Sequence, residues 1–144
     1  MGAVFDSSAL IAACVEAHPK HASAISWLKR AKNKEIEYLV SAHSLLEVYS
    51  VLTRAPFKPP ISPSTAKRLI EQNIKKDAKI ISLTGKEYFQ IIDRMTQLGL
   101  TGSIVYDAII VECARKSKAK EVITSNIKDF TRLIPDDSIK IITL

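Results

Sequence analysis

The sequence predicts an α/β fold, a three-layer α/β/α sandwich with a central parallel five-stranded sheet. Short apolar runs of strand length alternate along the chain with longer segments whose apolar residues recur at helical spacing. Strands that are separated by helices pair in parallel, because a parallel pair needs a crossover connection. The 144 residues suit a single domain, residues 1–144, that can bury a sizeable core without disulfides.

Five apolar runs are predicted as strands. They are residues 3–5, 38–40, 79–83, 121–124 and 139–143. The first run is followed directly by Asp6, and a polar segment, residues 125–129, leaves the carboxyl end of the fourth. Open α/β sheets place their functional sites at this end of the strands.

The segments between these runs have helical patterns. Ser7 or Ser8 can cap a helix that continues to residue 15, a second helix follows Pro19, and a third begins at Ser41 and extends to about residue 53. Residues 54–61 are too rich in proline for either element. Later helices are expected to begin at residue 62, at a capping box over residues 84–87 that ends at Gly99, and at residue 104.

Charge and composition narrow the class of protein. The net charge of +6 and the pI near 9.4 favour a polyanionic partner, nucleic acid first, although the lysines are scattered over several segments. Cys14 and Cys113 lie in apolar helical patterns, so we expect free thiols in a reducing compartment. The chain has no charged and apolar leader, and no apolar run approaches the roughly 20 residues of a membrane span. We expect a soluble, cytoplasmic protein.

Four carboxylates stand where the folding pattern alone would not place them. Asp6 ends the first strand, Glu47 lies within a helix, Asp107 opens an almost entirely apolar helix, and Asp129 follows the fourth strand. An ionised acid on a buried helix costs several kcal/mol unless a cation pairs with it. Each has a structural alternative: a solvated helix face for Glu47, the helix N-terminus for Asp107, and a turn or cap for the other two.

Taken together, the four acids predict a divalent-metal site. Carboxylates that converge raise one another's pKa, and a hard divalent cation keeps them ionised. Mg²⁺ or Mn²⁺ suits a site made only of oxygen ligands, and such ions promote phosphodiester hydrolysis by activating water. His43, Ser50 and Arg54 share the helix face of Glu47, which suggests a surface that contacts both metal and phosphate.

Four segments in order, VFDSSALI, HSLLEVYSVLTR, YDAIIVECAR and TSNIKDF, resemble those of PIN-domain ribonucleases, most of all the VapC-type toxins of prokaryotic toxin–antitoxin pairs. The resemblance spans nearly the whole chain. It implies a parallel five-stranded sheet and Mg²⁺- or Mn²⁺-dependent endonucleolytic cleavage of RNA. By motif position it gives the metal-binding roles to Asp6, Glu47, Asp107 and Asp129. Ser8 and Asn126 would orient ligands or water.

One departure from the family pattern, and one loop that resembles it, bear on the prediction. Asn126 stands where many relatives have an acid, so a second metal position would be weak or filled only with substrate bound. The loop RAPFKPPIS resembles the segment that follows the same helix in many VapC-type toxins. Its Arg54 would contact RNA phosphate or the antitoxin, or be a simple surface arginine. Relatives usually form homodimers and are inhibited by a small antitoxin.

Other interpretations of the sequence remain beside this one. A protein that binds RNA or a partner without cutting it would keep the same fold, and a PIN nuclease of ordinary RNA processing would keep the same site. A phosphatase of the haloacid type needs an acid where Ser8 stands. Zinc at Cys14, His18 and His21 is disfavoured because Pro19 interrupts a shared helix. Glu112 lies on another side of its helix from Asp107 and could serve only as an auxiliary ligand.

Overall fold

All strands of the chain join one parallel sheet. A computed structural model describes residues 1–136 and 138–144. The strand order is β3-β2-β1-β4-β5, and each neighbouring pair is parallel. The strands are β1 (Gly2–Phe5), β2 (Glu37–Ser41), β3 (Lys79–Ile81), β4 (Glu121–Thr124) and β5 (Lys140–Thr143). The parallel five-stranded sheet expected from the sequence is confirmed.

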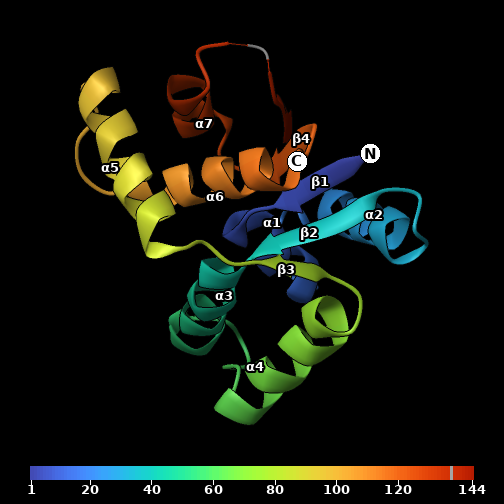
Figure 1. Cartoon of the computed structure of the whole chain (residues 1–144). Coiled ribbons are helices and arrows are strands. Elements are labelled where there is room, and N and C mark those ends of the chain that lie inside the picture. The colour runs from blue at the N-terminus through green and yellow to red at the C-terminus, as the bar shows by residue number, and fades with distance from the viewer. Residues whose placement is uncertain (137) are drawn as a thin grey trace.

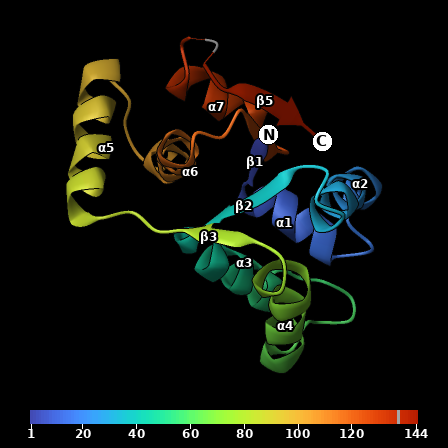
Figure 2. The ribbon, with the colours of Figure 1, turned by 45° about the vertical axis from the view of Figure 1, so that its right-hand side comes forward.

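Helices cover both faces of this sheet. In Figures 1 and 2 the helices α5, α6 and α7 lie on one side, and α1, α2, α3 and α4 lie on the other. The helices are α1 (Ser7–Cys14), α2 (His21–Lys32), α3 (Ala42–Arg54), α4 (Pro63–Ile70), the π-helical turn η1 (Glu71–Lys75), α5 (Gly85–Leu98), α6 (Ile104–Ser117) and α7 (Ile127–Leu133). None of the helices in the described part of the chain is long and apolar enough to span a membrane.

The core has two halves because side chains alternate across the central strand. Phe5 packs with Leu10 and Leu28 on the side of α1 to α4, whereas Val4 packs on the opposite side with the buried residues of α6. Successive residues of a strand point to opposite faces, and a parallel strand that is covered on both faces is therefore apolar throughout. The burial of β1 on both sides fixes Asp6, the next residue, at the edge of the core.

Several predicted boundaries hold, and three local features differ from the prediction. Thr84 and Glu87 form the expected capping box, and Gly99 ends α5 with a φ of 65°. The cap of α1 is Asp6 and not a serine, because its carboxylate already accepts from the Ala9 N–H. No helix is predicted after the fourth strand, yet the segment forms α7, whose buried Phe130 and Leu133 pack on the core. The third strand ends at Ile81, two residues earlier than predicted.

The strand order places a crevice beside β1. From β1 the chain moves outward to β2 and β3, and it returns on the other side of β1 to add β4 and β5. At this point the crossover connections on the two sides of β1 run in opposite directions, which opens a crevice at the carboxyl ends of β1 and β4. This is the usual place for a functional site in an open α/β sheet. Asp6 follows β1, and Thr124 ends β4, so both face this crevice.

Candidate functional site

Asp6 is the innermost acid of the site. Only 5% of its surface is exposed. Its Oδ1 accepts hydrogen bonds from the Ala9 N–H (2.9 Å) and the Ser8 hydroxyl (2.7 Å), and its Oδ2 accepts from the Thr124 hydroxyl (2.5 Å). Burial raises the pKa of Asp6, these hydrogen bonds lower it in part, and the charge of Glu47 raises it further. An ionised Asp6 therefore favours a cation nearby.

Glu47 reaches the same region from α3. Its Oε1 accepts from the Ser7 hydroxyl at 3.1 Å and lies 2.9 Å from His43 Nδ1. A carboxylate can only accept, so Nδ1 of His43 is the protonated nitrogen whenever Glu47 is ionised. Within the described residues no hydrogen bond is directed at Oε2. One oxygen is thus held in place while the other is available to a ligand.

Asp107 lies in the first turn of α6 and is half-buried. Its pKa is raised to about 6, first by burial and then by the negative charges of Asp6, Asp129 and Glu47. These three residues come from segments far apart in the chain. Asp6, Glu47 and Asp107 line one hollow, so the fold brings three of the four predicted acids to one place.

Asp129 lies at the edge of this group, in the first turn of α7. The Asn126 side-chain amide donates to Asp129 Oδ2 at 2.9 Å, and the Asn126 backbone N–H donates to the Thr124 hydroxyl at 2.9 Å. Asn126 therefore links the outermost acid to the residue that binds Asp6.

The acids open into a hollow of about 180 Å³. It is lined by Asp6, Ser7, Ser8, Glu47, Tyr106, Asp107, Ile110 and Asn126. No lysine or arginine is among the described residues of this lining. Of the predicted site residues, Asp129 lies just outside the lining, and Arg54 is exposed at the last residue of α3, away from the hollow.

The composition of the site fits a hard divalent cation. Its donors are carboxylate, hydroxyl and amide oxygens, the ligands that Mg²⁺ and Mn²⁺ prefer. No three acidic, histidine or cysteine side chains in the described ranges are spaced to hold one ion together. Mg²⁺ keeps several waters and often uses only one or two carboxylates, so this spacing suits it better than an ion that needs a full protein cage.

Several residues of the site were not predicted. Ser7 bonds Glu47, and Thr124 bonds Asp6. Lys20 places its ammonium group at the edge of the site. Its Nζ donates to the backbone carbonyl of Ser125 at 3.3 Å, and the backbone N–H of Ser125 donates to the Ser8 hydroxyl at 3.0 Å. Each of these contacts joins segments that only the fold brings together. Of these residues only Ser7 could have been suspected from the sequence, because it stands with Ser8 directly after Asp6.

Two other candidate ligand groups have different surroundings. Glu112 lines a separate hollow beside Arg94 and Asp93 of α5, so it does not reach the acids of the site. His18 accepts from the Lys20 N–H at 3.0 Å, and His21 Nδ1 lies 2.9 Å from the Ala12 carbonyl. Each histidine already has its own partner in the backbone. Burial also raises the pKa of Cys14 to about 11, which disfavours a thiolate ligand.

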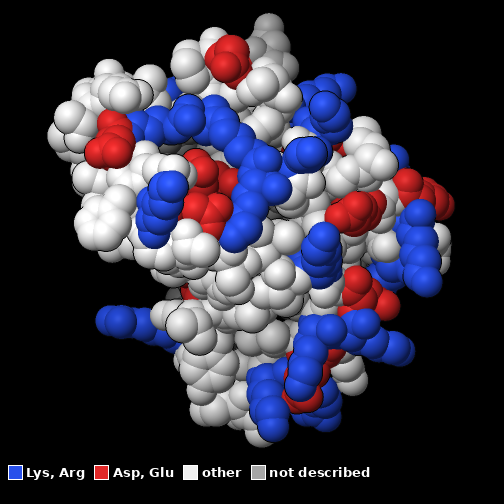
Figure 3. All heavy atoms as spheres, viewed as in Figure 1, with Lys and Arg blue, Asp and Glu red and all other residues white. Residues whose placement is uncertain are grey.

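Basic side chains are spread over the molecule. On the face seen in Figure 3, acidic atoms over α5 and α6 are enclosed by lysines and arginines, and further basic groups lie over the lower helices. This distribution agrees with the scattered lysines of the sequence. On this face, lysines and arginines surround the acidic area.

Comparison with known proteins identifies the family. The model of the PIN domain matches residues 3–133. Ribonuclease VapC27 of Mycobacterium tuberculosis is 30% identical over 115 residues, 80% of this chain and 78% of that protein. Ribonuclease VapC40 of the same species is 29% identical over 115 residues, covering 80% of each chain.

Solved structures have the same fold at lower identity. M. tuberculosis VapC20, described as a Sarcin-Ricin loop cleaving toxin, superposes with a TM-score of 0.72 at 14% identity, covering 90% of this chain and 94% of the other. VapBC2 from Rickettsia felis, bound to a DNA fragment from its promoter, gives 0.67 at 17% identity, covering 100% and 99%. The chain belongs to the PIN-domain family and is a VapC-like member of it.

Proposed function

We propose that this chain is a Mg²⁺- or Mn²⁺-dependent endoribonuclease that acts as the toxin of a toxin–antitoxin pair. The observation that carries the proposal is a hollow lined by three acids, Asp6, Glu47 and Asp107, with no basic side chain in its described lining and with Asp129 just outside it. An external cation stabilises the ionised form of such a group. The relatives named as ribonucleases support RNA as the substrate.

Asp6, Glu47, Asp107 and Asp129 are the proposed metal-binding acids, of which one or two would bind the ion directly and the others through its waters. A bound Mg²⁺ or Mn²⁺ would supply activation of water and stabilisation of charge on the leaving oxygen. The protein contributes fixed positions: Thr124 and Ser8 hold both oxygens of Asp6, while Ser7 and His43 hold Oε1 of Glu47.

Lys20 and Asn126 are proposed to orient the substrate. The Lys20 ammonium donates to the backbone carbonyl of Ser125, the residue before Asn126. From this position it would contact a phosphate of the RNA. Asn126 offers a side-chain amide at the lining of the hollow and would orient water or substrate. Arg54, which is exposed on α3, would serve a contact farther along the RNA or with the antitoxin.

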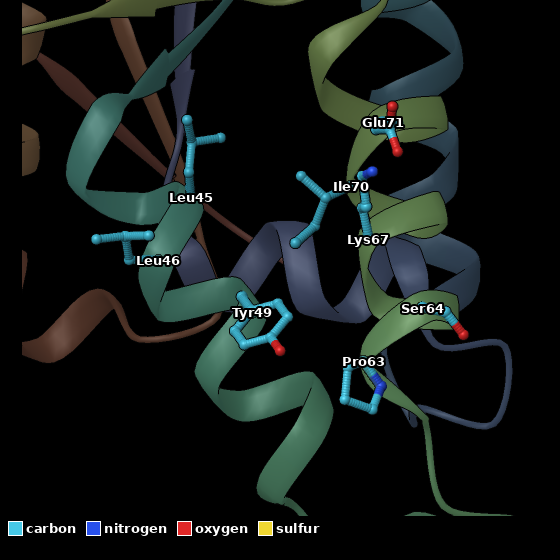
Figure 4. A pocket seen from close by; sticks show the side chains of 8 residues that line it. All are labelled: Leu45, Leu46, Tyr49, Pro63, Ser64, Lys67, Ile70 and Glu71. Atoms are coloured by element: carbon cyan, nitrogen blue, oxygen red, sulfur yellow. The ribbon is translucent and has the colours of Figure 1, made fainter.

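We also propose that the protein forms a homodimer and binds a small antitoxin. Exposed apolar surface supports protein contacts at two places. One is a groove of about 490 Å³ between α3 and α4, where Tyr49 and Ile70 point into the space between the helices and Lys67 and Glu71 stand at the rim (Figure 4). The second is the outer face of α5, which exposes Tyr88, Phe89 and Ile92. Both cysteines are free thiols, which fits the proposed cytoplasmic location.

The test is cleavage of total RNA by the purified protein with Mn²⁺, with Mg²⁺ and with chelator. Asp107→Asn, purified identically, excludes a contaminating nuclease. Glu112→Gln is a matched control, since it removes an acid from the same helix outside the hollow. We expect discrete metal-dependent fragments from the wild type and Glu112→Gln and none from Asp107→Asn. Absence of cleavage, once mass spectrometry has excluded a bound antitoxin, would support a binding-only protein instead.

A further inference from the structure

Tyr106 presents an aromatic ring at the edge of the acidic hollow. It directly precedes Asp107 on α6 and lines the hollow, yet 52% of its surface is exposed. The next residues of the helix facing the core, from Ala108 to Val111, are buried. The exposed part of this ring adds nothing to the core and is available for contact with a molecule outside the chain.

The orientation of the ring is fixed by His43. The two rings are parallel to within 7°, with centroids 5.8 Å apart, which is the spacing of an offset stack. His43 is held in turn by its 2.9 Å contact from Nδ1 to Glu47 Oε1. Helices α3 and α6 thus contribute one ordered aromatic pair, and that pair is connected to a carboxylate of the site.

An offset stack leaves part of the Tyr106 ring face open. Single-stranded RNA is recognised largely through unstacked bases that lie on tyrosine, histidine or other aromatic rings. A ring that is already ordered loses little conformational freedom when a base stacks on it. The ring lies beside the acids that would act on a phosphodiester, and the nucleotides on either side of that phosphate carry bases within reach of the same rim.

We propose that Tyr106 binds a nucleobase next to the cleaved phosphate by stacking, and that His43 positions the ring. The inference rests on the proposed ribonuclease function and adds a substrate requirement to it: the nucleotide beside the cut must be unpaired. Tyr106 is a substrate-binding residue in this scheme. His43 acts through Tyr106 and Glu47.

The experiment measures RNA binding without cleavage. The full chain carrying Asp107→Asn is the parent, and fluorescence anisotropy in Mg²⁺ gives its affinity for a labelled single-stranded RNA of about eight nucleotides, within the usual site sizes of single-strand binders. The RNA spans a cut mapped with the wild type. A second series replaces each nucleotide beside the cut by an abasic one.

We expect Tyr106→Ala in this parent to weaken binding of intact RNA roughly 5- to 150-fold, the range for loss of one stacked base. One abasic position should cause a similar loss in the parent and almost none in Tyr106→Ala. Tyr106→Phe should bind like the parent. Ile80→Ala, which removes an apolar side chain that is 36% exposed on β3 outside this hollow, should do the same. His43→Ala should reduce the abasic effect.

Two results would overturn the proposal. The first is undiminished affinity of Tyr106→Ala for intact RNA; if the oligomeric state of this variant is also altered, the ring belongs to a protein contact. The second is an abasic series that shows no loss at any position in the parent, a result that does not depend on whether the alanine variant folds. If the wild type neither cuts nor binds RNA, the ribonuclease function fails as well. If the wild type cleaves RNA and Tyr106→Ala binds RNA as tightly as its parent, only the stacking role is removed and the ribonuclease function stands.

Discussion

The hydroxyl of Thr124, at the end of β4, donates a 2.5 Å hydrogen bond to Oδ2 of Asp6, at the end of β1. The two residues are far apart in sequence but belong to paired neighbouring strands. Both are buried. The sheet therefore orients the innermost acid of the site directly.

Thr124→Val should destabilise the protein and weaken metal binding. Valine keeps the shape of threonine but leaves Asp6 Oδ2 without its donor, and a hydrogen bond to a charged group contributes about 1.5–3 kcal/mol to stability. Urea unfolding followed by circular dichroism measures the change. Thr143→Val, on the exposed end of β5, is the matched control and should stay within about 0.5 kcal/mol of wild type. Equal stability of the two variants would contradict a structural role for the Thr124 bond.

Asp107→Asn should stabilise the metal-free protein at neutral pH. The folded-state pKa of about 6 lies above the ordinary value of 3.8, so the folded state binds the proton more tightly than the unfolded state. Folding stability contributed by this group is present below pH 3.8 and is lost as the pH rises through 6. The gain from asparagine is about 1 kcal/mol above pH 6.5, since Asp107 is partly solvent-screened.

Melting temperatures of wild type and Asp107→Asn in chelator, from pH 4 to pH 8, measure this difference. The two curves should converge toward pH 4, where Asp107 is largely neutral in the wild type. A variant that is less stable than wild type at pH 7.5 would mean that Asp107 is not under electrostatic strain in the folded protein.

Mg²⁺ or Mn²⁺ should raise the melting temperature of the wild type. An ion that binds only the folded state stabilises it by about 2.7 kcal/mol when present at roughly 100 times its dissociation constant. The effect should be much smaller in Asp107→Asn and unchanged in Glu112→Gln, whose side chain lies in another hollow. Equal metal-induced shifts in wild type and Asp107→Asn would count against a shared metal site. Ca²⁺ and Na⁺ at matched ionic strength control for screening.

Ser7→Ala should weaken metal binding with little effect on the fold. It removes one of the two donors to Glu47 Oε1, at 3.1 Å, and loss of a residue that orients a ligand typically costs 10–100-fold in metal affinity, about 10-fold here because His43 remains. Calorimetric titration with Mn²⁺ gives the dissociation constant. Ser23→Ala on the exposed face of α2 is the control. An unchanged Mn²⁺ affinity would show that Ser7 does not orient Glu47 in the bound state.

Lys20→Ala should reduce the salt dependence of RNA binding. One phosphate contact contributes a slope of about −0.7 in a plot of log affinity against log salt for single strands. We therefore expect the slope to become shallower by about that amount, with weaker binding of all RNA sequences alike. Lys29→Ala, an exposed lysine of α2, should leave the slope unchanged. A slope that changes for neither variant would place the Lys20 ammonium outside the RNA path.

The sequence was sufficient for the sheet and for selecting the acids as candidates, because both depend on local patterns. Phe5 and its neighbours form a continuous apolar run, which is typical of a strand that is covered on both faces. Asp107 is an acid in the first turn of a largely apolar helix. The residues that hold the acids could not be found this way. Thr124 contacts Asp6 only because β4 pairs with β1, and strand order is a property of the whole fold.

Short elements with mixed polarity were also hard to predict. Helix α7 has only seven residues, and the polar residues of its first turn are also typical of a loop that follows a strand. Its apolar residues recur three apart, at Ile127, Phe130 and Leu133, which is a weak signal over so short a length. The cap of α1 was misassigned because three consecutive residues, Asp6 to Ser8, are all good caps, and only tertiary contacts select among them.

Asp6 has a structural role and a proposed metal-binding role, and experiments must keep the two apart. Its Oδ1 begins α1 by accepting the Ala9 N–H, and loss of a helix cap typically lowers stability by about 0.5–2 kcal/mol. A variant at Asp6 that fails to cut RNA therefore cannot distinguish a lost ligand from a loosened helix. Asp107 makes no such cap, since α6 begins at Ile104 behind Ser103. A harmless form of the protein for growth in cells, or for trapping intact RNA, is better made by altering Asp107 and leaving Asp6 in place.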